Sequence, residues 1–289
     1  MKRYIALQKV VEYGSFSRAA DAMGYTQSAL SQMIASLEDE LHMRLLNRYR
    51  TGVRLTSEGK ELYPSIQVLI NSYQATMTKA GEILGLDTGI IRMGVLGSIS
   101  VHWLPTLIKS FKEIYPHVEF VIHQGDHTSI EEWIRTGSVD FGFVNPRAVT
   151  GLQCEALTQG EMMAVLPKDH PLAQFDNVSL TSLSSEPFIL LEEGHYYEPL
   201  EAFKAVGVCP NVCYTIHDDY TIMTMVEAGL GVSILAGLIL RRTNYGIEIR
   251  STDPPVFRTV GLAYINKDSL PSASKKFIQH IKQNLSELP

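Results

Sequence analysis

The sequence predicts an α + α/β protein with a small winged helix-turn-helix at its start, then a long linker helix, then a larger two-lobed α/β part. Three observations predict this order. Residues 16–37 have the pattern of two short helices joined by a tight turn, and residues 56–84 carry a long helical stripe. From residue 90 onward, short apolar runs alternate with helical segments. A chain of 289 residues with 45% hydrophobic side chains is long enough for about two domains.

The helix-turn-helix is predicted from spacing and capping. The first helix places Phe16, Ala19 and Ala20 on one apolar face, and Gly24 lets the chain turn without strain. Thr26 is a good N-cap for the second helix. The buried face of that helix is predicted by apolar residues at three- and four-residue spacing, namely Leu30, Met33, Ile34, Leu37 and Leu41.

The opposite face of the second helix carries small neutral polar side chains that both donate and accept hydrogen bonds. These are Thr26, Gln27, Ser28, Ser31 and Gln32. Such groups suit base edges in the major groove of DNA, so this helix is the candidate recognition helix. The alternative is one corner of an ordinary helical bundle.

A basic hairpin after the second helix argues against that alternative. Arg48, Arg50 and Arg54 cluster around Thr51-Gly52, and Val53 and Leu55 alternate as in a short strand. Such a wing suits phosphates or the minor groove. We therefore take these three arginines as candidate DNA contacts.

Four segments carry a family resemblance: SFSRAADAM, TQSALSQ, LEDEL and LTSEG, in this order. In them the chain resembles the LysR-type transcriptional regulators, and the similarity extends over all 289 residues. That family usually has an aromatic residue where this chain has Leu46, and an arginine at the wing tip where it has Thr51. Arg50, one position earlier, is the candidate replacement for the wing-tip arginine.

The resemblance implies three parts: a DNA-binding domain over residues 1–59, a linker and dimerisation helix with a hinge over 60–88, and an effector-binding domain over 89–289. In the linker helix, a heptad-like stripe is formed by Leu62, Ile66, Leu69, Tyr73, Met77, Ala80 and Leu84. We expect it to pair with a second copy, giving a homodimer or homotetramer; folding back on its own domain is the alternative. Pro64 is expected to kink this helix or reset its start. Gly81, Gly85 and 87–89 form the expected hinge.

In the third part, strands are predicted at 90–95, 118–123 and 139–144, with helices between them. A similar set begins near Met162. Alternating strands and helices predict a parallel sheet with right-handed crossovers. Two such lobes resemble the periplasmic-binding-protein-like fold of the family's effector domain, with lobe I at about 89–160 and 266–289 and lobe II at about 161–265.

Ligands of open α/β sheets bind beyond the carboxyl ends of the strands. That rule selects the loops at 97–100, 124–128, 144–145, 193–197 and 217–221. Matched by position to the family, the effector pocket falls on Ser98, Ile99, Ser100, Gln124, His127, Asn145, Tyr220 and Thr221. Few lysines or arginines lie in these loops, so a small organic acid or amino acid is expected rather than a polyphosphate. The alternative to ligand contact, for each of these residues taken alone, is that its side chain caps a helix or faces the solvent.

Charge divides the molecule. Residues 1–60 hold nine basic and six acidic side chains, a net of +3, whereas the whole chain is at −6. One copy should therefore bind double-stranded DNA weakly, and useful affinity needs at least two copies. No apolar run reaches the roughly 20 residues of a membrane helix, and no secretory core opens the chain. A cytoplasmic protein without membrane contact is expected, with RNA polymerase as a further partner.

Other functions are disfavoured by missing motifs. The histidines lack zinc spacing, and no phosphate loop, nucleophile elbow or complete dinucleotide motif is present. We expect no catalytic residue, metal or cofactor. A solute-binding protein does not suit the basic N-terminal part. A metabolic enzyme with a helical cap stays an alternative, as does a redox-responsive regulator using Cys209 and Cys213 rather than incidental thiols.

Overall fold

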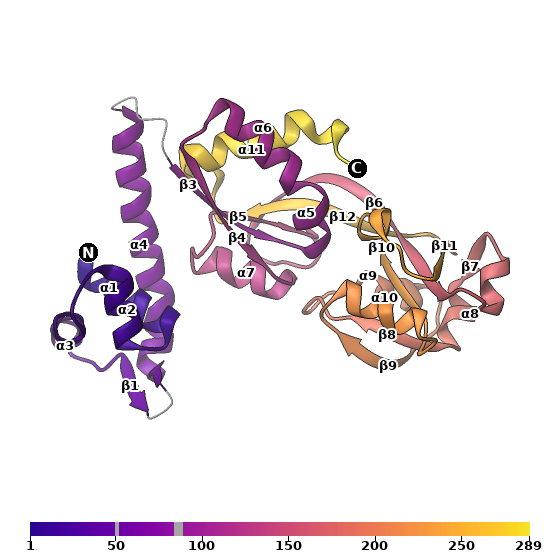
Figure 1. Ribbon diagram of the computed structural model, residues 1–289, viewed down its shortest axis with the longest axis horizontal. Coiled ribbons are helices and arrows are strands. Elements are labelled where there is room, and N and C mark those ends of the chain that lie inside the picture. The colour runs from indigo at the N-terminus through magenta and orange to yellow at the C-terminus, as the bar shows by residue number, and fades with distance from the viewer. Residues whose placement is uncertain (50–51, 84–88) are drawn as a thin grey trace. The chain divides into compact units, whose positions relative to one another are not determined.

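The computed structural model describes residues 1–49, 52–83 and 89–289. The chain divides into two compact units, the first containing residues 1–86 and the second almost all of the remainder (Figure 1). Several predicted features lie outside the described residues: Arg50 and Thr51 of the wing, Leu84 of the stripe, and Gly85 and 87–88 of the hinge. Among the described residues, no helix combines the length and apolarity needed to cross a bilayer.

The first unit is a winged helix-turn-helix followed by a long helix. Its elements are α1 (Lys2–Tyr13), α2 (Phe16–Met23), α3 (Gln27–Glu40), β1 (Leu46–Tyr49), β2 (Gly52–Leu55) and α4 (Ser57–Ile83). β1 and β2 pair antiparallel as the predicted hairpin, and the backbone N–H of Val53 donates to the carbonyl of Gly14 at 2.9 Å. This bond ties the wing to the end of α1.

Local capping sets the turn between α2 and α3. Ser15 Oγ accepts the backbone N–H of Arg18 at 3.4 Å, and Gly24 ends α2 in the left-handed conformation at φ 69°. Thr26 then caps α3. The core of this unit is one apolar cluster to which all four helices and the wing contribute side chains. It includes Leu7, Ala20, Leu30, Ile34, Leu37, Leu46 and Ile70.

The long helix α4 starts where the sequence predicts. Thr56 Oγ1 accepts the backbone N–H of Gly59 at 2.8 Å, and the helix continues from Ser57 to Ile83 with Pro64 inside it. The expected reset of the helix start at Pro64 is wrong, because the helix is continuous from Ser57 through Pro64. The predicted stripe divides into two parts: Ile66 packs in the unit's own core, whereas the side chains nearer the end of the helix are exposed, namely Leu69, Tyr73 and Met77.

Lobe I of the second unit is built on three parallel strands, with β3 between β4 and β5. Its elements are β3 (Gly89–Val95), α5 (Gly97–His102), α6 (Leu104–Ile114), β4 (Val118–Gln124), α7 (His127–Arg135), β5 (Phe141–Val144) and α11 (Ser272–Asn284). An aromatic core joins them, in which Phe111 and Phe277 lie edge to face with ring centres 5.0 Å apart.

Lobe II contains the second set of strands and helices. Its elements are β7 (Asn177–Ser179), α8 (Leu180–Ser184), β8 (Pro187–Leu191), α9 (Glu198–Ala205), β9 (Asn211–Ile216), α10 (Asp219–Glu227), β10 (Ser233–Ala236) and β11 (Ile247–Asp253). β8 and β9 are parallel, and two apolar clusters fill the lobe on either side of its strands.

Two long strands, β6 (Gln153–Pro167) and β12 (Val256–Tyr264), pass between the lobes (Figure 1). They pair antiparallel with each other, and β12 also pairs antiparallel with β5. The main sheet is therefore mixed, in the order β4-β3-β5-β12-β6-β11-β7, rather than parallel throughout. The predicted fold class, a winged helix-turn-helix with a long helix and a two-lobed α/β domain, is confirmed.

Candidate functional site

The candidate recognition face begins at the N-terminus of α3. Thr26 Oγ1 accepts a backbone N–H of the first turn at 3.2 Å and lies 3.1 Å from Ser28 Oγ. Gln27, Ser28 and Gln32 are exposed, and Ser31 is half-buried. These side chains keep free donors and acceptors on one face, which is the arrangement that base edges require. Their contact with DNA stays a prediction.

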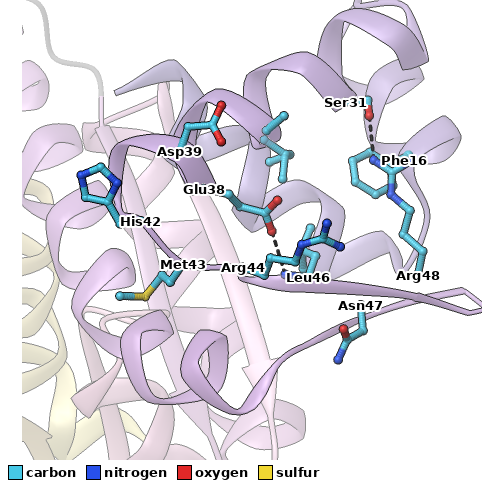
Figure 2. A pocket seen from close by; sticks show the side chains of 12 residues that line it. Phe16, Ser31, Glu38, Asp39, His42, Met43, Arg44, Leu46, Asn47 and Arg48 are labelled. Carbon is cyan, nitrogen blue, oxygen red and sulfur yellow. Dashed lines mark hydrogen bonds between the residues drawn. The ribbon is translucent and has the colours of Figure 1, made fainter.

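Arg48 connects the wing to this face. Its Nη2 donates to Ser31 Oγ at 2.7 Å, as Figure 2 shows, and its guanidinium lies 4.2 Å from the centre of the Phe16 ring. One cation is thus held at the junction of α2, α3 and β1 while remaining exposed. Arg54 is also exposed, on β2 opposite Asn47.

A groove of about 1060 Å³ runs between α3 and the start of the wing. Glu38 Oε1 accepts the backbone N–H groups of Leu45 and Leu46 at 2.7 and 3.1 Å, so this acid fixes the entry into β1 (Figure 2). Asp39 and Arg44 also line the groove. Both signs of charge therefore occur in this groove, whose lining also includes Ser31 and Arg48.

A second candidate site lies between the two lobes of the second unit. It is a pocket of about 240 Å³ whose walls are the loops after β3, β4, β8 and β9. Lobe I contributes Leu96, Gly97, Gln124, Gly125 and Asp126; lobe II contributes Leu191, Glu192, Glu193, His217, Asp218 and Asp219. These are strand-end loops of the kind that the sequence selected.

The predicted ligand residues of lobe I have different positions. Gln124 lines the pocket, and its Oε1 accepts a hydrogen bond from Ser100 Oγ at 3.1 Å. Ser98 is buried and lines a separate cavity of about 440 Å³, together with Trp103. The side chain of Ile99 lies wholly in the core of lobe I.

In lobe II, Tyr220 and Thr221 lie in the first turn of α10, and both are exposed. Thr221 donates to Asp218 Oδ1 from both its backbone N–H and its hydroxyl, each at 2.7 Å. Asp218 is therefore the N-cap of α10, and the two hydrogen bonds from Thr221 stabilise the start of that helix.

A buried polar network lies beside the pocket. Arg258, in the middle of β12, donates from Nε to Glu198 Oε1 at 2.9 Å and from Nη2 to Glu193 Oε2. Asn145 Nδ2 donates to Glu198 Oε1 at 2.9 Å, which links lobe I to this network. His127 Nδ1 accepts the backbone N–H of Asn145 at 3.4 Å. The predicted residues His127 and Asn145 therefore meet Glu193, which lies in a selected loop, and Arg258 and Glu198, which the sequence did not indicate.

The surroundings shift the pKa values of Glu193, Glu198 and His127 in different directions. Burial raises the pKa of Glu193 to about 7. Burial acts in the same direction on Glu198, but the charge of Arg258 and the hydrogen bonds from Arg258 and Asn145 outweigh it and lower that pKa to about 2. Burial and the charge of Arg258 lower the pKa of His127 to about 4, so this imidazole is neutral at pH 7.

Metal binding does not suit this network. Among the described residues, His127, Glu193 and Glu198 offer ligand atoms that lie within 4.8 Å of one another. Arg258, however, already bonds to both carboxylates and supplies their positive charge. Cys209 and Cys213 are free and exposed, and a redox role for them stays an alternative.

Arg258 was missed because its partners are far away in the sequence. The signal was a single arginine within the apolar run of residues 256–264, since a charge in a buried strand needs a partner. Glu198 was missed because its burial follows from the packing around it, whereas Asp219 lies in the selected loop 217–221 but was not singled out.

Comparisons with known proteins agree with this architecture. Residues 1–60 match the family described as bacterial regulatory helix-turn-helix protein, lysR family, and residues 84–286 match the LysR substrate binding domain. The chain is 31% identical to the uncharacterised HTH-type transcriptional regulator YvbU of Bacillus subtilis over 95% of each chain. It is 30% identical to the transcriptional dual regulator GltC of the same organism, over 90% of this chain and 89% of that protein.

Among solved structures, a full-length OxyR variant of Pseudomonas aeruginosa is similar, with a TM-score of 0.73 and 26% identity. The alignment covers 99% of this chain and 93% of that one. The two Bacillus subtilis relatives are regulators and not enzymes, so the alternative of a metabolic enzyme is set aside.

Proposed function

This chain belongs to the LysR family of transcriptional regulators, and from that premise we propose that α3 reads the bases of its target DNA while the pocket between the lobes binds its effector. The observation that carries the proposal is the row of exposed neutral side chains on α3, bounded by the anchored Arg48. Neutral groups discriminate between bases, and the neighbouring cations bind phosphates of any sequence.

We propose that α4 pairs two copies of the chain. Leu69, Tyr73 and Met77 are 42%, 41% and 55% exposed, an unusual amount of apolar surface for one helix. A dimer, or a tetramer built from two dimers, then presents two recognition helices to successive major grooves. We also propose a cytoplasmic location, which a DNA target favours.

The effector acts, in this proposal, by changing how the lobes stand relative to each other. The pocket has walls from both lobes, which β6 and β12 connect. A ligand that binds the closed form more tightly shifts the population toward it. The shift alters the placement of the dimers, and so DNA bending or contact with RNA polymerase.

The test is binding of the purified full-length protein to DNA from upstream of its own gene and of any divergent neighbour, at several salt concentrations. We expect retardation that survives competitor DNA of unrelated sequence and weakens as salt rises. Binding of equal strength to unrelated DNA, with and without candidate metabolites, would contradict sequence-specific regulation.

A further inference from the structure

The cavity of about 440 Å³ that Ser98 lines is larger than the pocket at the strand ends, and its size is typical of small-molecule sites. Its walls are largely apolar: Trp103, Met163, Leu238 and Val260 all line it. Trp103 comes from lobe I and Leu238 from lobe II, so both lobes form this larger cavity. The last two residues, 288 and 289, also line it.

Ser98 places a buried polar group in the larger cavity. It is 7% exposed, and its Oγ has no hydrogen-bond partner among the described residues without being sealed from solvent. Oγ therefore opens onto the cavity that Ser98 lines. A buried hydroxyl without a partner is unfavourable, and an atom of a bound ligand would supply the missing hydrogen bond.

Arg258 supplies the second buried group. Its Nε and Nη2 bond to Glu198 and Glu193, whereas its Nη1 has no partner in the described part of the chain. Nη1 is not sealed from solvent either, and Arg258 lines the larger cavity but not the smaller pocket. The N–H donors of Nη1 are therefore available to an acceptor in the larger cavity, even though the charge of Arg258 is already paired.

Gly160 keeps the space beside Arg258 open. It lies directly opposite Arg258 in the pairing of β6 with β12, where the side chains of facing residues share one side of the sheet. A Cβ built on Gly160 would meet no atom within 4 Å. Because Gly160 also lines the larger cavity, its missing side chain leaves room for a ligand next to the guanidinium.

Two further charged side chains line the larger cavity, and their charges balance. Arg241, in η2 (Ile239–Arg242), is exposed, and Glu161 is half-buried. Neither has an ion-pair partner among the described residues. The groups that are both buried and unpartnered, Ser98 Oγ and Arg258 Nη1, are hydrogen-bond donors. Donors at the end of an apolar cavity suit a ligand with an acceptor head and an apolar body.

We propose that the larger cavity is a second ligand site, which binds a small carboxylic acid with an apolar body. The carboxylate accepts hydrogen bonds from Arg258 Nη1 and Ser98 Oγ, and the body packs against Trp103 and Met163. The site is separate from the smaller pocket, although Arg258 also bonds to Glu193 in the wall of that pocket. It goes beyond the proposed function and does not depend on which effector the smaller pocket binds.

The experiment uses the full-length protein and four probes at equal ionic strength: hexanoate, hexanol, hexylamine and acetate. Hexanoate should bind in calorimetry and raise the melting temperature, because it alone combines a carboxylate with a long apolar body. Hexanol and hexylamine share the body, and acetate shares the carboxylate. Binding of hexanol or hexylamine as tight as that of hexanoate would overturn the proposed acid, and equally tight binding of acetate would overturn the role of the apolar walls.

Variants of Gly160 and Ser98 locate the site. Gly160→Val fills the space beside Arg258 from a backbone position that a side chain tolerates, and it should abolish hexanoate binding. Ser98→Ala removes a hydroxyl that has no partner, so the melting temperature without ligand should not fall. Hexanoate affinity should drop by about ten- to a hundredfold, the range for one hydrogen bond to a charged group.

Arg241→Gln should weaken hexanoate binding by a smaller factor, because this cation is exposed to solvent. Its matched control is Arg242→Gln, which makes the same change at the next residue, outside the lining of the larger cavity, and should leave hexanoate binding unchanged. A Gly160→Val protein that is folded by circular dichroism and binds hexanoate like the native protein would overturn the proposal. DNA binding by the same preparations tests the proposed function separately.

Discussion

Gln27 is the residue whose role in DNA recognition is most directly testable. It is exposed in the first turn of α3, and a side-chain amide can contact a base pair with two hydrogen bonds. Gln27→Ala should cost about 1–3 kcal/mol of discrimination between the target and a scrambled sequence. Fluorescence anisotropy with both DNAs measures this difference.

Arg54→Ala is the matched comparison, since Arg54 is exposed on β2 and is proposed to bind phosphates rather than bases. It should weaken binding to both sequences alike and reduce the salt slope by about one. Equal losses on both DNAs for Gln27→Ala would reject a base-reading role. Ser31→Ala is a less simple test, because Ser31 also holds Arg48 and both contacts are lost together.

Arg258 should contribute strongly to the stability of the second unit. In the part of the chain that the structure describes, its guanidinium is the only ion-pair partner of Glu193 and Glu198, and all three side chains are less than one-tenth exposed. Arg258→Met leaves two buried carboxylates unpaired and should lower the free energy of unfolding by about 3–5 kcal/mol. Urea denaturation followed by circular dichroism measures this loss.

The control for that change is Arg250→Met on strand β11 of the same sheet. Arg250 pairs with Glu248 at 2.9 Å, but both side chains are nearly one-third exposed. A partly exposed pair of this kind is worth about 1 kcal/mol or less. Similar losses for both variants would show that burial does not strengthen the Arg258 network.

At the scale of elements, local signals predicted local structure. Gly24 and Thr26 are caps in the sequence and caps in the fold, because a cap depends only on residues within one turn. Pairing between strands is not local. The apolar pattern located β3, β4 and β5, but it contains no information on the antiparallel insertion of β12 beside β5, so the mixed sheet was not predicted.

The difference between local and non-local signals also explains which parts of the pocket were predicted and which were missed. Its loops were predictable because ligands bind at strand ends whatever the pairing. β6 was expected only from Met162, yet it begins at Gln153, because residues 153–161 are mostly polar and partly exposed. Arg258 and Glu198 meet only because β12 and α9 pack together, which no spacing in the sequence encodes.

The exposed end of α4 leads to a prediction about assembly. Met77→Glu places a charge in the apolar stripe and should raise the dimer dissociation constant by at least about tenfold, since pairing would desolvate the carboxylate. Sedimentation velocity measures the change. Ser72→Glu adds the same charge on a neighbouring exposed face of α4 and should leave the dimer intact. A Met77→Glu protein that remains dimeric would place the interface elsewhere.

At the scale of the whole molecule, charge is divided by function. The first 60 residues are at +3 in a chain at −6, so the DNA-binding part attracts phosphate while the remainder is acidic. The carboxylates of the pocket are part of that acidic excess. His127, beside the pocket, and Glu193, in its wall, also make the free energy of unfolding depend on pH. The two groups act in opposite directions.

The sign for each group follows from its pKa in the folded protein. The pKa of His127 falls from 6.5 to about 4, because of burial and the charge of Arg258, so the unfolded chain binds the proton more tightly. Its contribution to stability is present above pH 6.5 and is lost as pH falls through 4. The pKa of Glu193 rises from 4.5 to about 7, so its contribution is present below pH 4.5 and is lost as pH rises through 7.

Between pH 7.5 and pH 5 the two contributions therefore offset each other in the native protein, and variants should separate them. Lowering the pH to 5 costs about 2 kcal/mol through His127, so His127→Gln should be less destabilised by this change than the native protein. Glu193→Gln loses the opposing contribution and should be more destabilised. Urea unfolding at the two pH values measures both differences, with Glu201→Gln as the control that should follow the native protein. If His127→Gln and Glu193→Gln shift the pH response in the same direction, the two groups are not the opposed pair that their surroundings imply.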